Sequence, residues 1–259
     1  MRRTVLTTAG LALSAALALT ACGSEAADKP SDKGADTSRS TTQSKKPEPF
    51  ADASGPEIAE QAMKATGNAK SLRIKGTVPD EEMGAITLDM AMDRGGSCAG
   101  SMSVGGGGRA EIVNDGKTVY MKYDEAFLRA QTKDESEAEV DAAVEMLGDR
   151  WLKTSATGDG AEDLEAFCDL DQLLAEFTGG TSSVGKGERT TVDGQEAITL
   201  TEKNGKDTYS MYVATEGKPY ILRVTDDGAE DGENLVFTDY DKPVDAKAPT
   251  GDVLDLDAL

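Results

Sequence analysis

Two long stretches of the chain alternate apolar and polar residues, and this alternation constrains the fold most. It runs over 71–123 and again over 182–240. A strand with one buried and one solvated face has this period of two, and antiparallel sheets are built from such strands. Tight-turn sequences interrupt the alternation at 94–96, 114–116 and 192–194, and again at Asn204-Gly205. We therefore expect consecutive strands to pair through hairpins, as meanders.

Three other stretches have helical spacing. Ser54-Gly55-Pro56-Glu57 has the form of a helix start, and an amphipathic helix is predicted over roughly 56–68. Residues 124–149 are helical in pattern and very acidic, while 161–177 carry a wide apolar stripe. The order is helix, strands, helices, strands. The prediction is the α+β class: a curled antiparallel half-barrel sheet of about ten strands, with helices covering its concave face.

The first residues have the pattern of a bacterial lipoprotein signal peptide. Arg2 and Arg3 are followed by a short apolar run and by Leu19-Thr20-Ala21-Cys22, which has the form of a lipobox. The apolar run is short for a membrane-spanning helix. We expect cleavage after residue 21 and a diacylglycerol on Cys22, which would anchor the protein to the outer face of the cell membrane. The alternative is a plain signal peptide in which Cys22 is incidental.

A polar tether is expected after the lipidated cysteine. In residues 23–55 the only large apolar residue is Phe50, so the segment cannot bury a core and is expected to be disordered. The domain organisation is then a signal peptide over 1–21, the lipidated Cys22 with its tether over 22–55, and a single domain over 56–259.

The composition excludes several functions. With 48 Asp+Glu against 27 Lys+Arg the formal charge is −21, which disfavours nucleic-acid binding. Histidine is absent, which removes Ser-His-Asp and Cys-His nucleophiles and His-based zinc sites. The glycines at 105–108 lack the Lys-Ser/Thr of a phosphate loop, and the acidic 226–233 lacks calcium-loop spacing. No catalytic residue, metal site or cofactor is predicted.

Two cysteines remain once Cys22 is assigned to the lipid. Outside the membrane, Cys98 and Cys168 would most simply form a disulfide. Closing a loop of about 70 residues would contribute about 4 kcal/mol in the chain-entropy model. The alternative is two buried free thiols.

The order of elements carries a resemblance, together with three local stretches. These are IVNDGKTVYMK at 112–122, RWLK at 150–153 and Ala248-Pro249. Over about 56–250 the chain resembles the LppX/LprG group of actinobacterial lipoproteins, which share the half-barrel fold of the lipoprotein carriers LolA and LolB. The resemblance implies a hydrophobic cavity between sheet and helices, which in some members carries lipids or lipidated glycans. Cys98 and Cys168 are not a hallmark of the group.

Several apolar side chains are candidates for lining such a cavity. Methionine suits adaptable apolar surfaces, and a chain with only 5% aromatic residues could leave its interior under-filled. For any single methionine, ordinary core packing is the simpler interpretation. The cavity candidates are Leu88, Met90, Met92, Met102, Met121, Phe167, Leu174, Met211 and Leu222.

The leading functional hypothesis is a membrane-anchored, non-enzymatic extracytoplasmic lipoprotein that binds a lipid or another apolar or amphiphilic ligand. The second is an envelope interaction or signalling module whose sheet docks a partner protein. The third is a hydrolase that uses carboxylates alone, for which no pair of acidic residues stands out. An enclosed apolar interior would favour the first hypothesis, and a solid interior with an exposed apolar patch the second.

Overall fold

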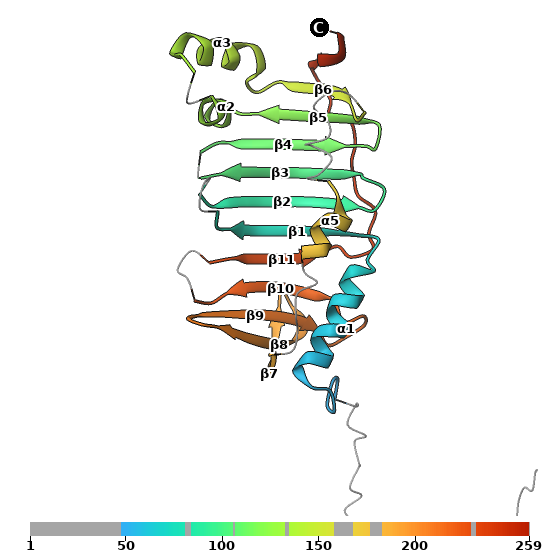
Figure 1. Ribbon diagram of the computed structural model, residues 1–259. Helices are drawn as coiled ribbons and strands as arrows, with labels where there is room; N and C mark the ends of the chain where they lie inside the picture. Colours follow the sequence, from blue (N-terminus) through green and yellow to red (C-terminus); the bar gives the residue numbers. More distant parts are fainter. Residues whose placement is uncertain are drawn as a thin grey trace, which may run out of the picture. The chain divides into compact units, whose positions relative to one another are not determined.

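The structure is a computed structural model, and it describes residues 48–80, 84–105, 107–132, 135–157, 168–176, 183–228 and 232–258. Contacts divide the chain into two units, 1–44 and 45–259. The expected signal peptide and Cys22 lie outside the described residues. Within the second unit, the described residues form one sheet with helices packed on it (Figure 1).

Twelve strands make up this sheet, in the order β12-β6-β5-β4-β3-β2-β1-β11-β10-β9-β8-β7. The α+β class with an open, half-barrel-like sheet is confirmed, with twelve strands where about ten were expected. The sheet is uncurled, whereas a curled sheet with a concave face was expected. The strands are β1 (Ser71–Val78), β2 (Ile86–Asp93), β3 (Cys98–Val104), β4 (Arg109–Asn114), β5 (Thr118–Tyr123), β6 (Trp151–Ser155), β7 (Gly185–Val192), β8 (Gln195–Asn204), β9 (Asp207–Ala214), β10 (Ile221–Asp226), β11 (Asn234–Thr238) and β12 (Val253–Asp255).

Two antiparallel meanders meet at β1. Strands β1 to β6 pair in sequence order, and so do β7 to β11. The last strand of the second meander then pairs with the first strand of the first, with Ile74 opposite Phe237. This long-range pairing makes one sheet out of two local units, and β1 lies in its interior.

The hairpin turns form where the sequence predicted them. Between β4 and β5, the Asn114 side chain accepts a hydrogen bond from the Gly116 amide at 2.8 Å, and Gly116 has φ +85°. Between β7 and β8, Asp193 and Gly194 have φ +48° and +83°. Two successive positive φ values are those of a type I′ turn, whose twist matches that of the strands it joins.

Four α-helices lie within the described residues: α1 (Gly55–Gly67), α2 (Glu125–Gln131), α3 (Glu137–Leu147) and α5 (Leu170–Glu176). The predicted first helix is confirmed, and it begins with a capping box in which Ser54 and Glu57 each accept from the other's backbone amide. The first part of the helix predicted over 161–177 lies outside the described residues. No described helix is long and apolar enough to cross a membrane.

Helices α1 and α5 pack on one face of the sheet. Ile58, Ala62 and Leu170 belong to the same buried cluster as Leu72 and Phe237 of the strands. Figure 1 shows both helices in front of the sheet, α5 over its middle strands and α1 toward β7–β10. Helix α2 packs instead against α3 and β4. The expectation that helices cover one face therefore holds for α1 and α5.

The C-terminal tail contains a strand that the alternation did not indicate. Strand β12 pairs parallel with β6, Leu254 lying opposite Leu152. Acidic side chains of the tail hold it there: Asp252 pairs with Arg150 at 2.9 Å, and the Asp257 carboxylate accepts from Thr154 at 2.7 Å. A three-residue strand is too short to show a period of two. The sheet is therefore antiparallel except at this edge.

Candidate ligand-binding face

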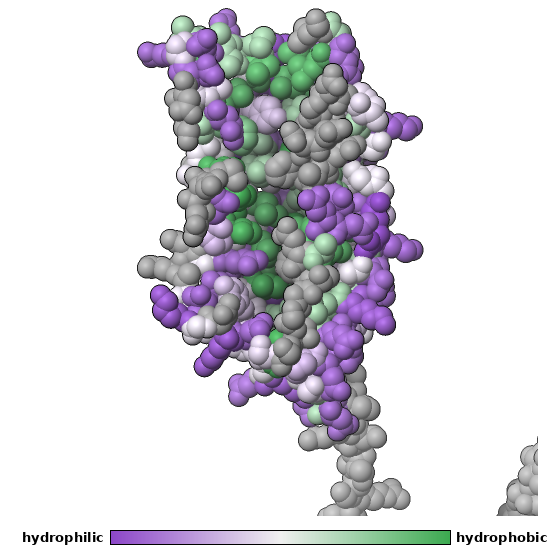
Figure 2. Space-filling view, viewed as in Figure 1, coloured by the Kyte–Doolittle hydropathy of each residue, from purple (hydrophilic) through white to green (hydrophobic). Residues whose placement is uncertain are grey.

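The face of the sheet that α1 and α5 cover carries the main core, and we call it the inner face. Registers place its inward positions in straight rows across the strands. One row joins Phe237, Ile74 and Met90, continues at Ile112 and Met121, and is almost wholly buried. Figure 2 shows apolar side chains gathered over the middle strands of this face, with hydrophilic residues around them.

A second row of inward positions lies beside the first, two residues along each strand, and its side chains are less buried. We call it the apolar row, and it runs across β9, β10, β11, β1, β2, β3, β4 and β5. With about 4.8 Å between strands, it is about 34 Å long. Most of its large side chains pack on the core but remain half-buried, so part of their apolar surface is open. Its members are Met211, Val224, Leu235, Gly76, Leu88, Met102, Ala110 and Tyr123.

Glycines occupy two inward positions of the inner face, one on β1 and one on β3. Gly76 belongs to the apolar row, and Gly100 lies between Met90 and Ile112 in the buried row. A Cβ on Gly76, which has φ +153°, would lie 1.8 Å from the Asn234 carbonyl oxygen, and one on Gly100 would lie 2.1 Å from that of Asp89. Close strand approach therefore requires glycine at both positions. As a result, neither position contributes a side chain to the inner face.

The phenol of Tyr123 ends the apolar row at β5. Its hydroxyl donates to the Met121 sulfur at 3.1 Å, and its ring stacks on Phe127 of α2 with centroids 5.2 Å apart. Burial raises the pKa of Tyr123. A phenol that points along the inner face toward a methionine stays neutral and offers the row an apolar ring.

Most of the predicted cavity residues share the inner face. Met90, Met92, Met121 and Leu174 are buried in the main cluster, as the simpler interpretation of the methionines held. Three candidates, Leu88, Met102 and Met211, lie in the half-buried apolar row. Phe167 lies outside the described residues.

The prediction for Leu222 was wrong. Leu222 is buried in a separate cluster with Val192, Ala197 and Ala214, while the preceding Ile221 joins the main core. The pairing of β10 with β9 shifts between Ile221 and Arg223, which marks a β-bulge. One extra residue reverses the alternation before Val224, so Leu222 faces away from the inner face.

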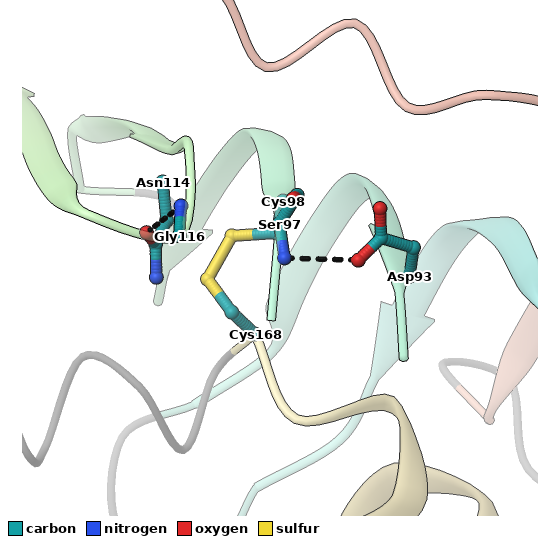
Figure 3. The surroundings of a disulfide bond; sticks show 6 residues. All are labelled: Asp93, Ser97, Cys98, Asn114, Gly116 and Cys168. Carbon is teal, nitrogen blue, oxygen red and sulfur yellow. Dashed lines mark hydrogen bonds between the residues drawn. A yellow bond between two sulfur atoms is a disulfide. The ribbon is translucent and has the colours of Figure 1, made fainter. Parts of the chain in front are cut away.

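A disulfide lies at one end of the inner face, the end farther from the apolar row, which we call the closed end. Cys98 at the start of β3 is bonded to Cys168, just before α5, and their Cα atoms are 5.4 Å apart (Figure 3). Both residues are fully buried. The bridge therefore fixes the start of α5 to the β2–β3 hairpin. The predicted pairing is therefore the one found, and not the alternative of two buried free thiols.

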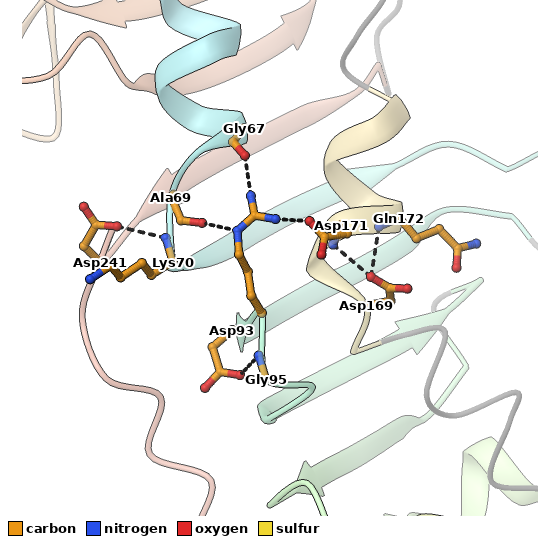
Figure 4. A network of polar contacts seen from close by, with 10 residues as sticks. Gly67, Ala69, Lys70, Asp93, Gly95, Asp169, Asp171, Gln172 and Asp241 are labelled. Carbon is orange, nitrogen blue, oxygen red and sulfur yellow. Dashed lines mark hydrogen bonds and ion pairs between the residues drawn. The ribbon is translucent and has the colours of Figure 1, made fainter. Parts of the chain in front are cut away.

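An arginine from the same hairpin makes a second link to α5. Arg94 donates to the Ala69 carbonyl at 2.7 Å, to the Gly67 carbonyl and to the Asp171 carboxylate. Figure 4 shows these acceptors converging from the end of α1 and the start of α5. One side chain thus holds both helices at the closed end. The sequence showed Arg94 only as part of a turn, since its partners are distant in the chain.

A polar pocket of about 370 Å³ lies beside this link. Asp93, Asn114, Asp169 and Asp171 line it together with the turn glycines, and Cys168 and Leu170 contribute apolar surface. Three of these polar side chains already accept hydrogen bonds from nearby backbone amides: Asp93 from Gly95, Asn114 from Gly116 and Asp169 from Gln172. The pocket is therefore part of the polar rim of the closed end and is not an apolar binding site.

Two carboxylates lie on β8 and β10 beside the β9 end of the apolar row. Register places Glu202, Tyr209 and Asp226 one inward position beyond Leu200, Met211 and Val224. The charge of Asp226 raises the pKa of Tyr209. Burial, with a smaller contribution from Asp226, raises the pKa of Glu233. The open end of the row is thus acidic.

Comparison with known proteins identifies the fold. No family model and no curated protein matches the chain. Among solved structures, LprF from Mycobacterium bovis is 15% identical with a TM-score of 0.50, over 76% of this chain and 97% of that chain. The chain is similar in fold to LprF. The lipoprotein LppX from Mycobacterium tuberculosis is 13% identical with a TM-score of 0.43, over 74% of this chain and 98% of that chain. The fold that the sequence resemblance implied is confirmed.

Proposed function

We propose that this protein is a membrane-anchored extracytoplasmic lipoprotein that binds a lipid or another amphiphile on its inner face, without catalysing a reaction. The apolar row carries this proposal. Five of its eight members are half-buried apolar side chains, and no charged residue interrupts it from β9 to β5. Its length of about 34 Å is close to the hydrocarbon thickness of a bilayer, so it is long enough for an extended acyl chain.

Two further features support a ligand in this position. Gly76 and Gly100 place no side chain on the inner face in β1 and β3, so no bulky group stands over the apolar row or the buried row at these two positions. The disulfide and Arg94 fix the start of α5 and the end of α1 at the end of the inner face that lies away from the apolar row. Each methylene of a ligand buried there would contribute about 0.8 kcal/mol.

The anchor in this proposal is the lipobox. A diacylglycerol on Cys22 would hold the domain near the membrane through the polar tether expected over 22–55, within reach of lipids. Replacing Cys22 by alanine should abolish incorporation of labelled palmitate and release the chain from the membrane fraction. Palmitate labelling that persists in Cys22→Ala would contradict the anchor, and would leave the ligand proposal standing.

Native mass spectrometry of the purified mature chain tests the ligand. We expect bound lipid on the wild type and its loss from the double variant Leu88→Gln/Met102→Gln, which places amides in the apolar row. The matched control is Thr87→Gln/Ser103→Gln, at the adjacent positions of β2 and β3 that face the other way. Circular dichroism checks that both variants fold.

Two results would refute the ligand proposal. One is a wild-type chain that carries no lipid when isolated and takes up none from added phospholipid. The other is equal lipid loss in the inward and outward variants, which would show that the apolar row has no special part. If the chain folds but binds no lipid, the second hypothesis, an envelope interaction or signalling module, is favoured instead.

A further inference from the structure

The opposite face of the sheet differs in charge from the rest of the chain. This outer face consists of the strand positions between the inward ones. Although the whole chain has a formal charge of −21, basic side chains outnumber acidic ones at these positions. The basic ones are Arg73, Lys75, Arg109, Lys122, Lys153, Lys203 and Arg223, and the acidic ones are Asp89, Asp93, Glu111, Glu188 and Asp255.

Ion pairs on this face leave the positive charge in excess. Asp89 is shared by Arg73 at 2.6 Å and Lys75 at 3.6 Å. Glu111 is likewise 4.0 Å from both Arg109 and Lys122. These two carboxylates therefore have two cations each, whereas Asp255 pairs with Lys153 alone at 2.9 Å.

Arg223 extends the basic surface beyond these pairs. It lies opposite Val236 of β11 and Tyr212 of β9. Its Nε is buried and has no hydrogen-bond partner in the part of the chain that the structure describes. The basic surface thus reaches from β6 to β10.

Aromatic residues with a polar edge share the same face. Trp151, the single tryptophan of the chain, lies opposite Lys122, and Tyr120 lies opposite Lys153. Tyr212 lies opposite Arg223. All three aromatic side chains are half-buried. Tryptophan and tyrosine concentrate at membrane–water interfaces, and basic residues bind anionic headgroups.

We propose that the outer face docks on the surface of an anionic lipid bilayer. Charge complementarity favours this partner. An anionic surface repels the acidic chain as a whole, but it attracts the outer face, where basic residues outnumber acidic ones. Docked in this way, the protein turns its inner face and the acidic end of the apolar row away from the headgroups. The inference goes beyond ligand binding and does not require it.

Trp151 provides a built-in reporter for this contact. The mature chain with Cys22→Ser, which cannot carry the lipid, is mixed with vesicles of phosphatidylglycerol and phosphatidylcholine, or of phosphatidylcholine alone. We expect a blue shift of Trp151 emission, and its quenching by brominated acyl chains, only with the anionic vesicles. The association should weaken as salt rises, because the headgroup attraction is screened.

Charge reversal on the face tests its position. Lys75→Glu/Lys122→Glu should lower the partition coefficient by at least tenfold, since each basic residue near an anionic surface contributes about fivefold. The control Lys64→Glu/Lys247→Glu makes the same change in net charge on α1 and in the tail, and should lower it far less.

Three outcomes would overturn the proposal. They are absence of binding to anionic vesicles, equal weakening by the two double variants, and binding that leaves Trp151 unquenched. The first would also leave a protein partner as the occupant of the face. None of them bears on lipid uptake by the inner face, which the mass measurement reports separately.

Discussion

Removing the disulfide should cost this protein a large part of its stability without changing its fold. The double variant Cys98→Ala/Cys168→Ala opens a covalent loop with a sequence separation of 70. In the chain-entropy model such a loop contributes about 4 kcal/mol, because the bridge restricts the unfolded chain. For a domain of this size, that corresponds to a fall of about 8 to 16 °C in Tm.

The native contacts indicate why the fold should survive. Leu170 and Leu174 of α5 remain buried in the main core, and Arg94 still holds Asp171. Most of the loss should therefore appear through the unfolded state, which becomes less compact. In urea, the midpoint should fall and the dependence of the unfolding free energy on denaturant should steepen.

Urea unfolding of the variant, followed by circular dichroism, measures this. Wild-type protein treated with a reductant is the matched control, since it loses the same bond and keeps both sulfurs. A loss below about 1 kcal/mol in both samples would refute the reasoning, because the loop would then not restrict the unfolded chain as the model requires. A loss in the variant alone would assign the effect to packing of the buried sulfurs.

Two further predictions concern single positions. Gly76→Ala should destabilise the domain by about 3 kcal/mol, as the new Cβ meets the backbone of Asn234, whereas Gly67→Ala, with open space around it, should be nearly neutral in thermal unfolding. The hydrogen bond from Lys218 lowers the pKa of Asp241. Its contribution to stability is present above the ordinary aspartate pKa and is lost as the pH falls through the lowered value. Asp241→Asn should therefore reduce Tm at pH 7 and lessen its fall in acid, and an unchanged acid profile would contradict this.

Local signals in the sequence were sufficient for most of the sheet. The turn at Asp193-Gly194 needs only two residues that accept positive φ, and the alternation through β1, β2 and β3 states which side chains face the core. Both signals depend on neighbours in the chain. For this reason the strands, the hairpins and the first helix could be predicted from the sequence.

The features that failed or were missed depend on distant partners. The residues around Leu222 carry no local signal for the irregular pairing of β10 with β9. The tail also carries no local signal that Leu254 pairs with β6. Arg94 likewise gains its role only when the ends of α1 and α5 arrive beside it. Each case needs the tertiary register, and a shift of one residue is enough to reverse a face.

The same dependence limits what composition alone could say about the candidate cavity residues. Composition directed attention to methionines, and the register shows that Met90, Met92 and Met121 fill the core in the usual way. Which inward positions stay half-buried depends instead on the register and on where the helices are fixed, as Leu88, Met102 and Met211 show. Gly76 and Gly100 are glycines because a Cβ at either position would meet the backbone of the neighbouring strand, so the absence of a side chain at these inward positions follows from sheet packing itself. The strip that we propose as the ligand site is therefore defined by the tertiary register, with no residue whose type alone would mark it.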